Sequence, residues 1–355
     1  MLERIAAAFR AGERIYAQQG SPLYAALAKA GADDPDILAL ASKGLAGATP
    51  VHLFTSVHYL LLGGIADPLA RFFPTLTADA APPGQAWPDF HRFCLKHRSE
   101  LERLLRTRPV QMTYVERCRT LLPAICHVAE QSGEPLNLIE IGCSAGVLLA
   151  FDKFAYQYRD GERIGPENAP FILNGRMHGD ARLRMPRIGT RCGIDLNVID
   201  PRSPEDRRWM LATCFPELRD EQQHLAGAMD IVAESDIRWL EGDALIHLPQ
   251  VLAATPDPVC VYHSACLFYW PVEAKAALDA QLRAASLTRT IYRIGIEPSE
   301  RFDEWQTGAL RSPSDADETA KPSGEINVAC YRGGNAESKR VALSDAKFGT
   351  VWWLD

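Results

Sequence analysis

The chain has 355 residues, of which 47% are hydrophobic and 23% are charged, and its formal net charge at pH 7 is −7. This composition excludes a disordered chain, a collagen-like repeat and a coiled coil, and the length predicts about two domains. The negative net charge provides no global attraction to nucleic acid or to anionic lipid, so neither is expected as a partner.

The sequence also carries no signal for a membrane or a secretory route. No stretch reaches the ~18 consecutive apolar residues of a membrane span, and the first residues lack the features of a secretory signal. Nine cysteines are scattered without a Cys-x-x-Cys pair, as is typical of buried thiols in a reducing compartment. We therefore expect a cytoplasmic protein. No metal site is expected, because His52 and His58 do not share a face of their predicted helix.

Residues 1–132 are predicted to form an all-α domain, because their apolar residues recur with the helical period. Ser21 followed by Pro22 is typical of a helix N-terminus. Further helices are predicted at 34–40, 51–62, 88–105 and 113–131. The segment Ser132-Gly133-Glu134-Pro135 ends the last helix and marks the expected domain boundary.

Residues 133–355 are predicted to form an α/β domain with a doubly wound, mostly parallel sheet, because short apolar strands alternate with helices. The strands are expected at 136–141, 191–194, 237–240, 259–262 and 290–294, and the helices at 204–215, 221–233, 244–253 and 272–285. A hairpin of residues 326–332 and 340–343 and a strand at 350–354 predict antiparallel C-terminal strands. Residues 300–324 are expected to form a surface loop.

The most informative segment is Glu140-Ile141-Gly142-Cys143-Ser144-Ala145-Gly146, which joins the first predicted strand to a helix expected to run to about residue 156. The helix N-terminus at such a turn offers free N–H groups to a ligand beyond the carboxyl edge of the sheet. A dinucleotide site with the pattern Gly-x-Gly-x-x-Gly fits poorly, because positions 144 and 147 are Ser and Val.

The same segment matches the Gly-x-Ser-x-Gly pattern of serine hydrolases, in which Ser144 would be the nucleophile. Asp243 and His263 are the candidate partners. Three features disfavour this alternative. The preceding chain is predicted to be helical, and no histidine follows His263. Glu140 would also place a carboxylate near the developing oxyanion, where negative charge is unfavourable. A serine hydrolase therefore stays the less favoured reading.

Glu140, Gly142, Ser144 and Gly146 resemble the first motif of class I S-adenosylmethionine-dependent methyltransferases, with Ser144 in place of the middle glycine. The resemblance implies that the turn lies against the methionine moiety of S-adenosylmethionine and that Glu140 helps to place its ammonium group. It also implies that an acid ending the second strand, Asp195 or its neighbour Asp200, binds the ribose. Asp243, which follows the third strand, would face the adenine.

Six segments spread over nearly the whole chain carry a second resemblance. They are Ser21–Tyr24, Val57–Leu62, Phe90–Cys94, Val110–Gln111, Glu140–Gly146 and Gly193–Asp195. Together they are similar to a bacterial family of unknown function, and the resemblance implies a helical N-terminal part and a methyltransferase-like C-terminal part. The chain departs from the family pattern at Met112-Thr113-Tyr114 and at Asp345–Gly349. A non-catalytic ligand-binding protein on a methyltransferase-like fold is therefore the alternative function.

His263 and Ser264 end the fourth predicted parallel strand, near the point where acceptors bind in such folds. His263 is a candidate general base, since an unperturbed histidine has a pKa of roughly 6.5. Ser264 is a candidate hydrogen-bond donor to the acceptor. The leading prediction is a methyltransferase that acts on a small-molecule substrate, with S-adenosylmethionine as its cofactor; the sequence does not indicate an oligomeric state.

Overall fold

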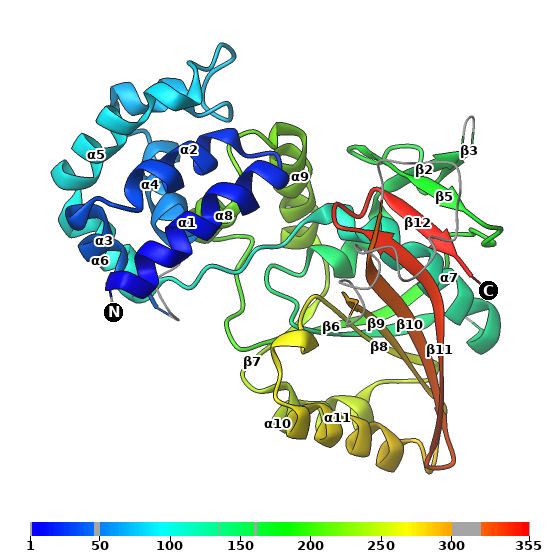
Figure 1. Cartoon of the computed structure of the whole chain (residues 1–355). Coiled ribbons are helices and arrows are strands. Elements are labelled where there is room, and N and C mark those ends of the chain that lie inside the picture. Colours follow the sequence, from blue (N-terminus) through cyan, green and yellow to red (C-terminus); the bar gives the residue numbers. More distant parts are fainter. Residues whose placement is uncertain (1, 46–49, 134, 160–161, 300–320, 355) are drawn as a thin grey trace. The chain divides into compact units, whose positions relative to one another are not determined.

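The computed structural model describes residues 2–45, 50–133, 135–159, 162–299 and 321–354 (Figure 1). The chain forms two compact units. The helical unit comprises Met1–Thr113 and Arg202–Ala226, and the sheet unit comprises Tyr114–Pro201 and Gly227–Asp355. Within the described ranges, no helix is both long enough and apolar enough to cross a membrane.

The helical N-terminal region is present as expected, but the two units divide the chain differently from a single boundary after residue 132. The helix α7 (Cys118–Ser132) belongs to the sheet unit, and the helix α8 (Pro204–Thr213) belongs to the helical unit. Trp209 and Ala212 of α8 and Phe215 lie in the same buried cluster as the N-terminal helices. Because these apolar residues are buried against the N-terminal helices, α8 belongs to the helical unit although part of the sheet unit precedes it in the chain.

Short helices surround one apolar core in the helical unit. Tyr24 lies at its centre, with ring-centroid distances of 4.9 Å to Phe54 and 5.6 Å to Phe215. The remaining helix α9 (Arg219–Glu234) begins in this unit and ends in the sheet unit. The other elements are α1 Leu2–Gln18, α2 Pro22–Gly31, α3 Pro35–Ala41, α4 Pro50–Leu62, α5 Trp87–Lys96 and α6 Arg98–Thr107, with the 3-10 helices η1 Pro68–Phe72 and η2 Pro83–Gln85.

The helix α2 begins after Ser21 as predicted, but the Ser21 side chain does not cap it. The Ser21 hydroxyl donates a hydrogen bond of 2.7 Å to Oε2 of Glu217. Oε1 of Glu217 accepts a hydrogen bond of 2.8 Å from the backbone N–H of Leu23. A carboxylate from a distant part of the chain thus satisfies a free N–H group of this helix.

A nine-stranded sheet forms the framework of the sheet unit, in the order β5-β12-β11-β10-β9-β8-β1-β6-β7. The five strands from β7 to β9 are mutually parallel, whereas β10, β11 and β12 form antiparallel pairs. The prediction of a mixed α/β fold with a large, mostly parallel sheet is confirmed. The bounds are β1 Leu136–Ile141, β5 Arg176–His178, β6 Ile188–Asp195, β7 Arg238–Glu241, β8 Val259–Ser264, β9 Ile291–Pro298, β10 Pro322–Arg332, β11 Asn335–Asp345 and β12 Thr350–Trp353.

The strand order reverses between β1 and β8. From β1 the chain proceeds to β6 and β7 on one side, and later to β8 and β9 on the other. The carboxyl ends of parallel strands at such a switch point form the usual ligand crevice of a doubly wound sheet. This topology directs attention to the residues that follow β1 and β8.

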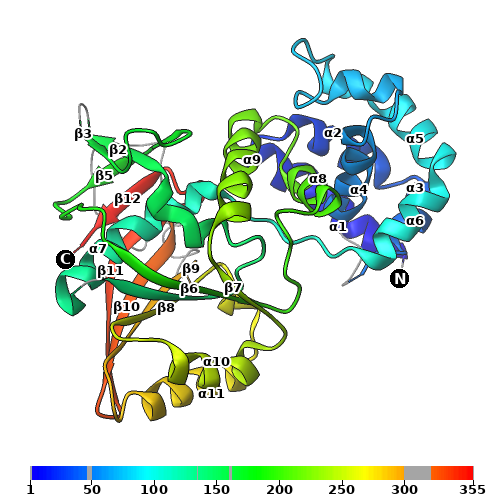
Figure 2. The ribbon, with the colours of Figure 1, turned by 180° about the vertical axis from the view of Figure 1, so that it is seen from behind.

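Helices cover both faces of the sheet (Figures 1 and 2). The helices α10 (Ala244–Ala254) and α11 (Val272–Ala285) lie together on one face, where Leu248 and Leu278 share a buried cluster with Ile139 and Ile141 of β1. The helix α7 lies on the other face, toward which Glu140 points because side chains alternate along a strand. The 3-10 helices of this unit are η3 Val115–Arg117, η4 Val147–Lys153 and η5 Leu267–Tyr269.

The prediction of a helix from the glycine-rich turn to about residue 156 is wrong. Only the 3-10 helix η4 follows the turn, and the chain then enters the strand β2 (Ala155–Arg159). Tyr156 and Tyr158 are buried, whereas Gln157 and Arg159 are not, and this alternation favours a strand. The strand β2 pairs with β3 (Glu162–Ile164) and β4 (Ile172–Asn174) in a separate three-stranded sheet.

The predicted C-terminal hairpin is confirmed, with β10 and β11 joined at Gly333-Gly334. Both glycines have positive φ angles, of +57° and +79°, which favour glycine in a tight hairpin turn. The predicted final strand corresponds to β12. Of the predicted surface loop, residues 300–320 lie outside the described residues, and residues 322–324 belong to β10.

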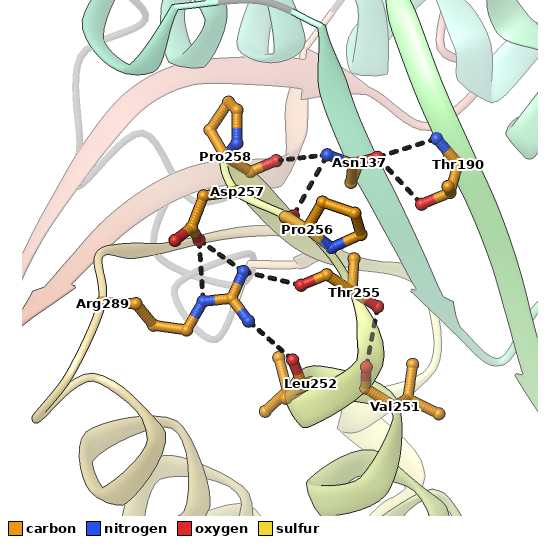
Figure 3. A network of polar contacts seen from close by, with 9 residues as sticks. All are labelled: Asn137, Thr190, Val251, Leu252, Thr255, Pro256, Asp257, Pro258 and Arg289. Carbon is orange, nitrogen blue, oxygen red and sulfur yellow. Dashed lines mark hydrogen bonds and ion pairs between the residues drawn. The ribbon is translucent and has the colours of Figure 1, made fainter.

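Asn137 fixes the amino end of β1 between its two parallel neighbours (Figure 3). Its side-chain amide donates to the carbonyl oxygens of Pro256 (3.1 Å) and Pro258 (3.3 Å), before β8. Its carbonyl oxygen accepts from the N–H (2.8 Å) and the hydroxyl (2.9 Å) of Thr190 in β6. Arg289 holds the segment before β8 through Asp257 and two carbonyl groups. These contacts set the positions of the strands that form the switch point.

Candidate functional site

The turn after β1 has a left-handed backbone at three positions, with φ angles of +78° at Gly142, +51° at Ser144 and +66° at Gly146. A Cβ atom on Gly142 would lie 2.5 Å from Sγ of Cys266, and one on Gly146 would lie 2.3 Å from a ring carbon of Trp239. Both glycines are therefore required by backbone conformation and by close neighbours. Ser144 is a non-glycine residue in a conformation that few such residues adopt.

Asp195 ends β6 and attaches this strand to the turn. Its Oδ2 accepts a hydrogen bond of 2.8 Å from the N–H of Ser144, and its Oδ1 accepts one of 3.0 Å from the N–H of Asn197. Asp195 and not Asp200 is the acid at the strand end.

Glu140 is 1% exposed and is incompletely hydrogen-bonded. Its Oε2 accepts a hydrogen bond of 3.2 Å from the hydroxyl of Tyr262 on β8. Its Oε1 is buried and has no hydrogen-bond partner among the described residues. Burial is the main cause that raises the pKa of Glu140 well above its ordinary value; Asp195 adds to the effect, whereas Tyr262 and Arg117 oppose it. A buried acceptor without a partner is costly, so a donor from a ligand or a water molecule would stabilise it.

Asp243 follows β7 and caps α10. Its Oδ1 accepts a hydrogen bond of 2.8 Å from the N–H of Leu245. The residue is exposed, so the carboxylate is accessible to a ligand in addition to its capping role. Its neighbour Glu241 accepts a hydrogen bond of 3.2 Å from the N–H of Val198.

His263 forms a buried pair with Glu297 of β9. The distance from Nδ1 of His263 to Oε1 of Glu297 is 2.7 Å. Burial is the main cause that lowers the pKa of His263. Burial alone would raise the pKa of Glu297, but the hydrogen bond and charge of His263 and two backbone N–H groups lower it overall. These directions favour a neutral imidazole that donates from Nδ1 to a carboxylate, which leaves Nε2 as an acceptor.

Nε2 of His263 is buried and has no hydrogen-bond partner among the residues described. His263 is opposite Ile141 in the β1–β8 register, and Glu140 is opposite Tyr262. His263 therefore faces the side of α10 and α11, whereas Glu140 faces the side of α7. His263 makes no hydrogen bond to Ser144, the contact that the hydrolase alternative requires.

Ser264 ends β8 and is 5% exposed. Its hydroxyl has no hydrogen-bond partner in the described part of the chain, and its carbonyl oxygen accepts a bond of 3.2 Å from Nη1 of Arg117. Cys266 follows closely, and burial raises the pKa of its thiol to about 12. Cys266 is therefore a neutral thiol at pH 7 and is not activated as a nucleophile.

Two other features lie away from these strand ends. In the helical unit, the ligand atoms of Asp34, Asp36 and His91 lie within 4.8 Å of one another, but Asp34 already caps α3 through Ile37. In the sheet unit, a small pocket contains none of the residues predicted for the site. Its lining is Pro123, His127, Glu130, Asp180, Arg182 and Trp353.

The predicted cofactor and catalytic residues thus lie at the carboxyl ends of the neighbouring strands β7, β6, β1 and β8 or in the segments that follow them. One family model, described as an uncharacterized protein conserved in bacteria (DUF2332), matches residues 6–353. The chain belongs to this family. The match spans segments of both units. A comparison with curated proteins finds no match.

In this DUF2332 protein, two charged residues of the candidate site, Glu297 and Arg117, were not predicted from the sequence. Glu297 lies near the end of β9, and an acid at the end of the fifth parallel strand was a signal that could have found it. Arg117 precedes α7 and offers no comparable signal. Its position beside Ser264 depends on how α7 packs on the sheet.

Proposed function

We propose that this protein is an S-adenosylmethionine-dependent methyltransferase with a small-molecule acceptor. The observation that carries the proposal is Oε1 of Glu140, a buried acceptor without a partner at the carboxyl end of the central strand. A ligand ammonium group would supply the missing donor, and its positive charge would stabilise the ionised carboxylate that burial disfavours in the ligand-free protein.

The surrounding residues fit such a ligand. The strand order β7-β6-β1-β8-β9, with β10 antiparallel to β9, agrees with the resemblance to the methyltransferase fold. Gly142, Ser144 and Gly146 would present the turn to the methionine moiety. Asp195 would accept from the ribose hydroxyls, and the exposed Asp243 would accept from the adenine amino group.

When bound, S-adenosylmethionine supplies an electrophilic methyl group on a sulfonium. Nε2 of His263 would accept a proton from an acceptor that must lose one, and the carboxylate of Glu297 would stabilise the resulting imidazolium. The hydroxyl of Ser264 would orient the acceptor through a hydrogen bond.

Isothermal titration calorimetry of the full chain with S-adenosylmethionine tests the proposal, with adenosine as the ligand that lacks the ammonium group. We expect binding of S-adenosylmethionine and a weakening of about tenfold in Glu140→Gln, because the variant loses a charged acceptor. Exposed Glu337→Gln is the matched control. The proposal fails if millimolar S-adenosylmethionine gives no heat of binding. Binding without methyl transfer to a broad acceptor panel would favour the non-catalytic alternative.

A further inference from the structure

Arg117 is a charged residue of the sheet unit with one side-chain hydrogen bond among the described residues. A guanidinium group has five N–H donors. Nη1 donates to the carbonyl oxygen of Ser264, whereas Nε is buried and has no hydrogen-bond partner among the described residues. The guanidinium carbon lies 5.6 Å from the ring centroid of Phe348, so an aromatic surface supports one side of the group.

The nearby acids do not pair with this cation. Glu140 and Glu297 act on Arg117 electrostatically, but neither forms an ion pair with it within 4.0 Å among the described residues. Burial lowers the pKa of Arg117 more than Tyr114, Glu140 and Glu297 raise it. A buried charge normally has a partner, so the cation lacks part of its expected compensation.

The two acids also differ in what they can offer. The raised pKa of Glu140 favours its neutral form, which does not compensate a positive charge. Glu297 carries a negative charge, but its oxygens already accept from His263 and from the backbone N–H groups of Cys266, Leu267 and Phe268. A bound anion would therefore supply the negative charge that Arg117 lacks.

We infer that Arg117 and Ser264 bind a carboxylate of the acceptor substrate. Nε of Arg117 and the hydroxyl of Ser264 are both buried donors without a partner in the described chain, and the two residues are in direct contact. A carboxylate accepts hydrogen bonds through two oxygens and suits the planar geometry of a guanidinium group. This inference rests on the proposed function, because it assigns the carboxylate to the acceptor.

Aromatic residues near Arg117 indicate the rest of the acceptor. Phe268 and Tyr269 follow β8, are 44% and 77% exposed, and have ring centroids 3.7 Å apart. Tyr269 follows Ser264, the residue that Arg117 contacts, closely in the chain, and it acts electrostatically on Arg117. Exposed aromatic rings beside a cation suit a ligand with an apolar body and one anionic end. The inferred acceptor class is a small aromatic carboxylic acid.

The test uses the full chain and three probes, namely benzoate, phenylacetate and 3-phenylpropionate, each with its neutral amide. Ligand-observed NMR and thermal unfolding measure binding. We expect at least one carboxylate to bind, its amide to bind about tenfold more weakly or not at all, and the difference to disappear in Arg117→Gln. Arg117→Lys keeps the charge and should retain part of the preference. Exposed Arg106→Gln, in α6, is the matched control.

Equal affinity for each acid and its amide would overturn the inference, as would an unchanged preference in Arg117→Gln. The comparison of acid and amide in the unmodified protein decides the question even if a variant fails to fold. Titration with S-adenosylmethionine separates the two proposals. Cofactor binding without carboxylate binding refutes this inference alone, whereas Arg117-dependent carboxylate binding without cofactor binding refutes the proposed function and the assignment to an acceptor.

Discussion

The indole of Trp239 lies against the backbone of Gly146, so that a Cβ on this glycine would be 2.3 Å from a ring carbon. Trp239 is opposite Gly193 in the β6–β7 register, and Gly193 is opposite Glu140 in the β1–β6 register. The missing side chain of Gly193 leaves room for Cys143, whose Sγ would be 2.8 Å from a Cβ there. Close approach of the turn to the sheet thus depends on two glycines and one tryptophan.

Gly146→Ala should destabilise the protein by about 3 kcal/mol, because the added methyl group collides with Trp239 and the left-handed backbone disfavours alanine. Urea unfolding measures the effect. Gly84→Ala is the control, since a Cβ at Gly84 meets no atom within 4 Å. Gly146→Ala with Trp239→Ala should recover part of the loss. Equal stability of the two glycine variants would contradict the packing argument.

Replacement of Asp243 separates its capping role from a role in ligand binding. Asp243→Ser retains a side-chain acceptor for α10 and removes the carboxylate, so we expect little change in the melting temperature. S-adenosylmethionine binding should weaken by about tenfold through the lost adenine contact. Asp243→Ala should lose about 1 kcal/mol of stability as well. If Asp243→Ser binds the ligand as tightly as the unmodified protein, the carboxylate only caps the helix.

Glu140 should make the ligand-free protein less stable as the pH rises. The pKa of Glu140 is higher in the folded protein than in the unfolded chain. Between these two pKa values the folded protein binds more protons than the unfolded chain, so its stability falls as the pH rises. Glu140→Gln removes this dependence. From pH 5 to pH 8, the free energy of unfolding of Glu140→Gln should therefore rise relative to that of the unmodified protein. The difference should change by up to about 1.4 kcal/mol per pH unit.

Urea unfolding across this pH range measures the difference, and Glu337→Gln, at an exposed position, is the control. Parallel pH profiles for Glu140→Gln and the unmodified protein would show that Glu140 is ionised without cost in the folded state.

His58 should make the helical unit sensitive to acid. Its ring nitrogens contact the hydroxyl of Thr75 (2.8 Å) and the carbonyl oxygen of Ala212 (3.2 Å). Burial is the main cause that lowers its pKa to about 4. A histidine of the unfolded chain titrates near 6.5, so stability should fall between pH 6.5 and pH 4, by up to about 3 kcal/mol. His58→Gln should flatten this part of the profile, measured by thermal unfolding; an unchanged slope would contradict the assignment.

Local patterns in the sequence determined much of the framework. The strand β1 and the helix α11 have the predicted bounds, because their apolar runs end at clear turn or helix-start signals. The glycines at positions 142 and 146 were also informative in the sequence, because a sharp turn after a buried strand needs residues that adopt the left-handed conformation. Acids at the strand ends were likewise visible in the sequence, which is why Glu140, Asp195 and Asp243 could be nominated.

Contacts between distant segments required the tertiary structure. Glu217 accepts a hydrogen bond from the backbone N–H of Leu23, which lies 194 residues before it in the chain, and Arg117 contacts Ser264. Glu297 on β9 contacts His263 on the neighbouring strand β8. The sequence records which groups can donate, accept or carry charge, because these properties belong to single residues. Which groups stay unpaired is decided only when the sheet and its covering helices exclude water, because burial and partners are properties of the folded chain.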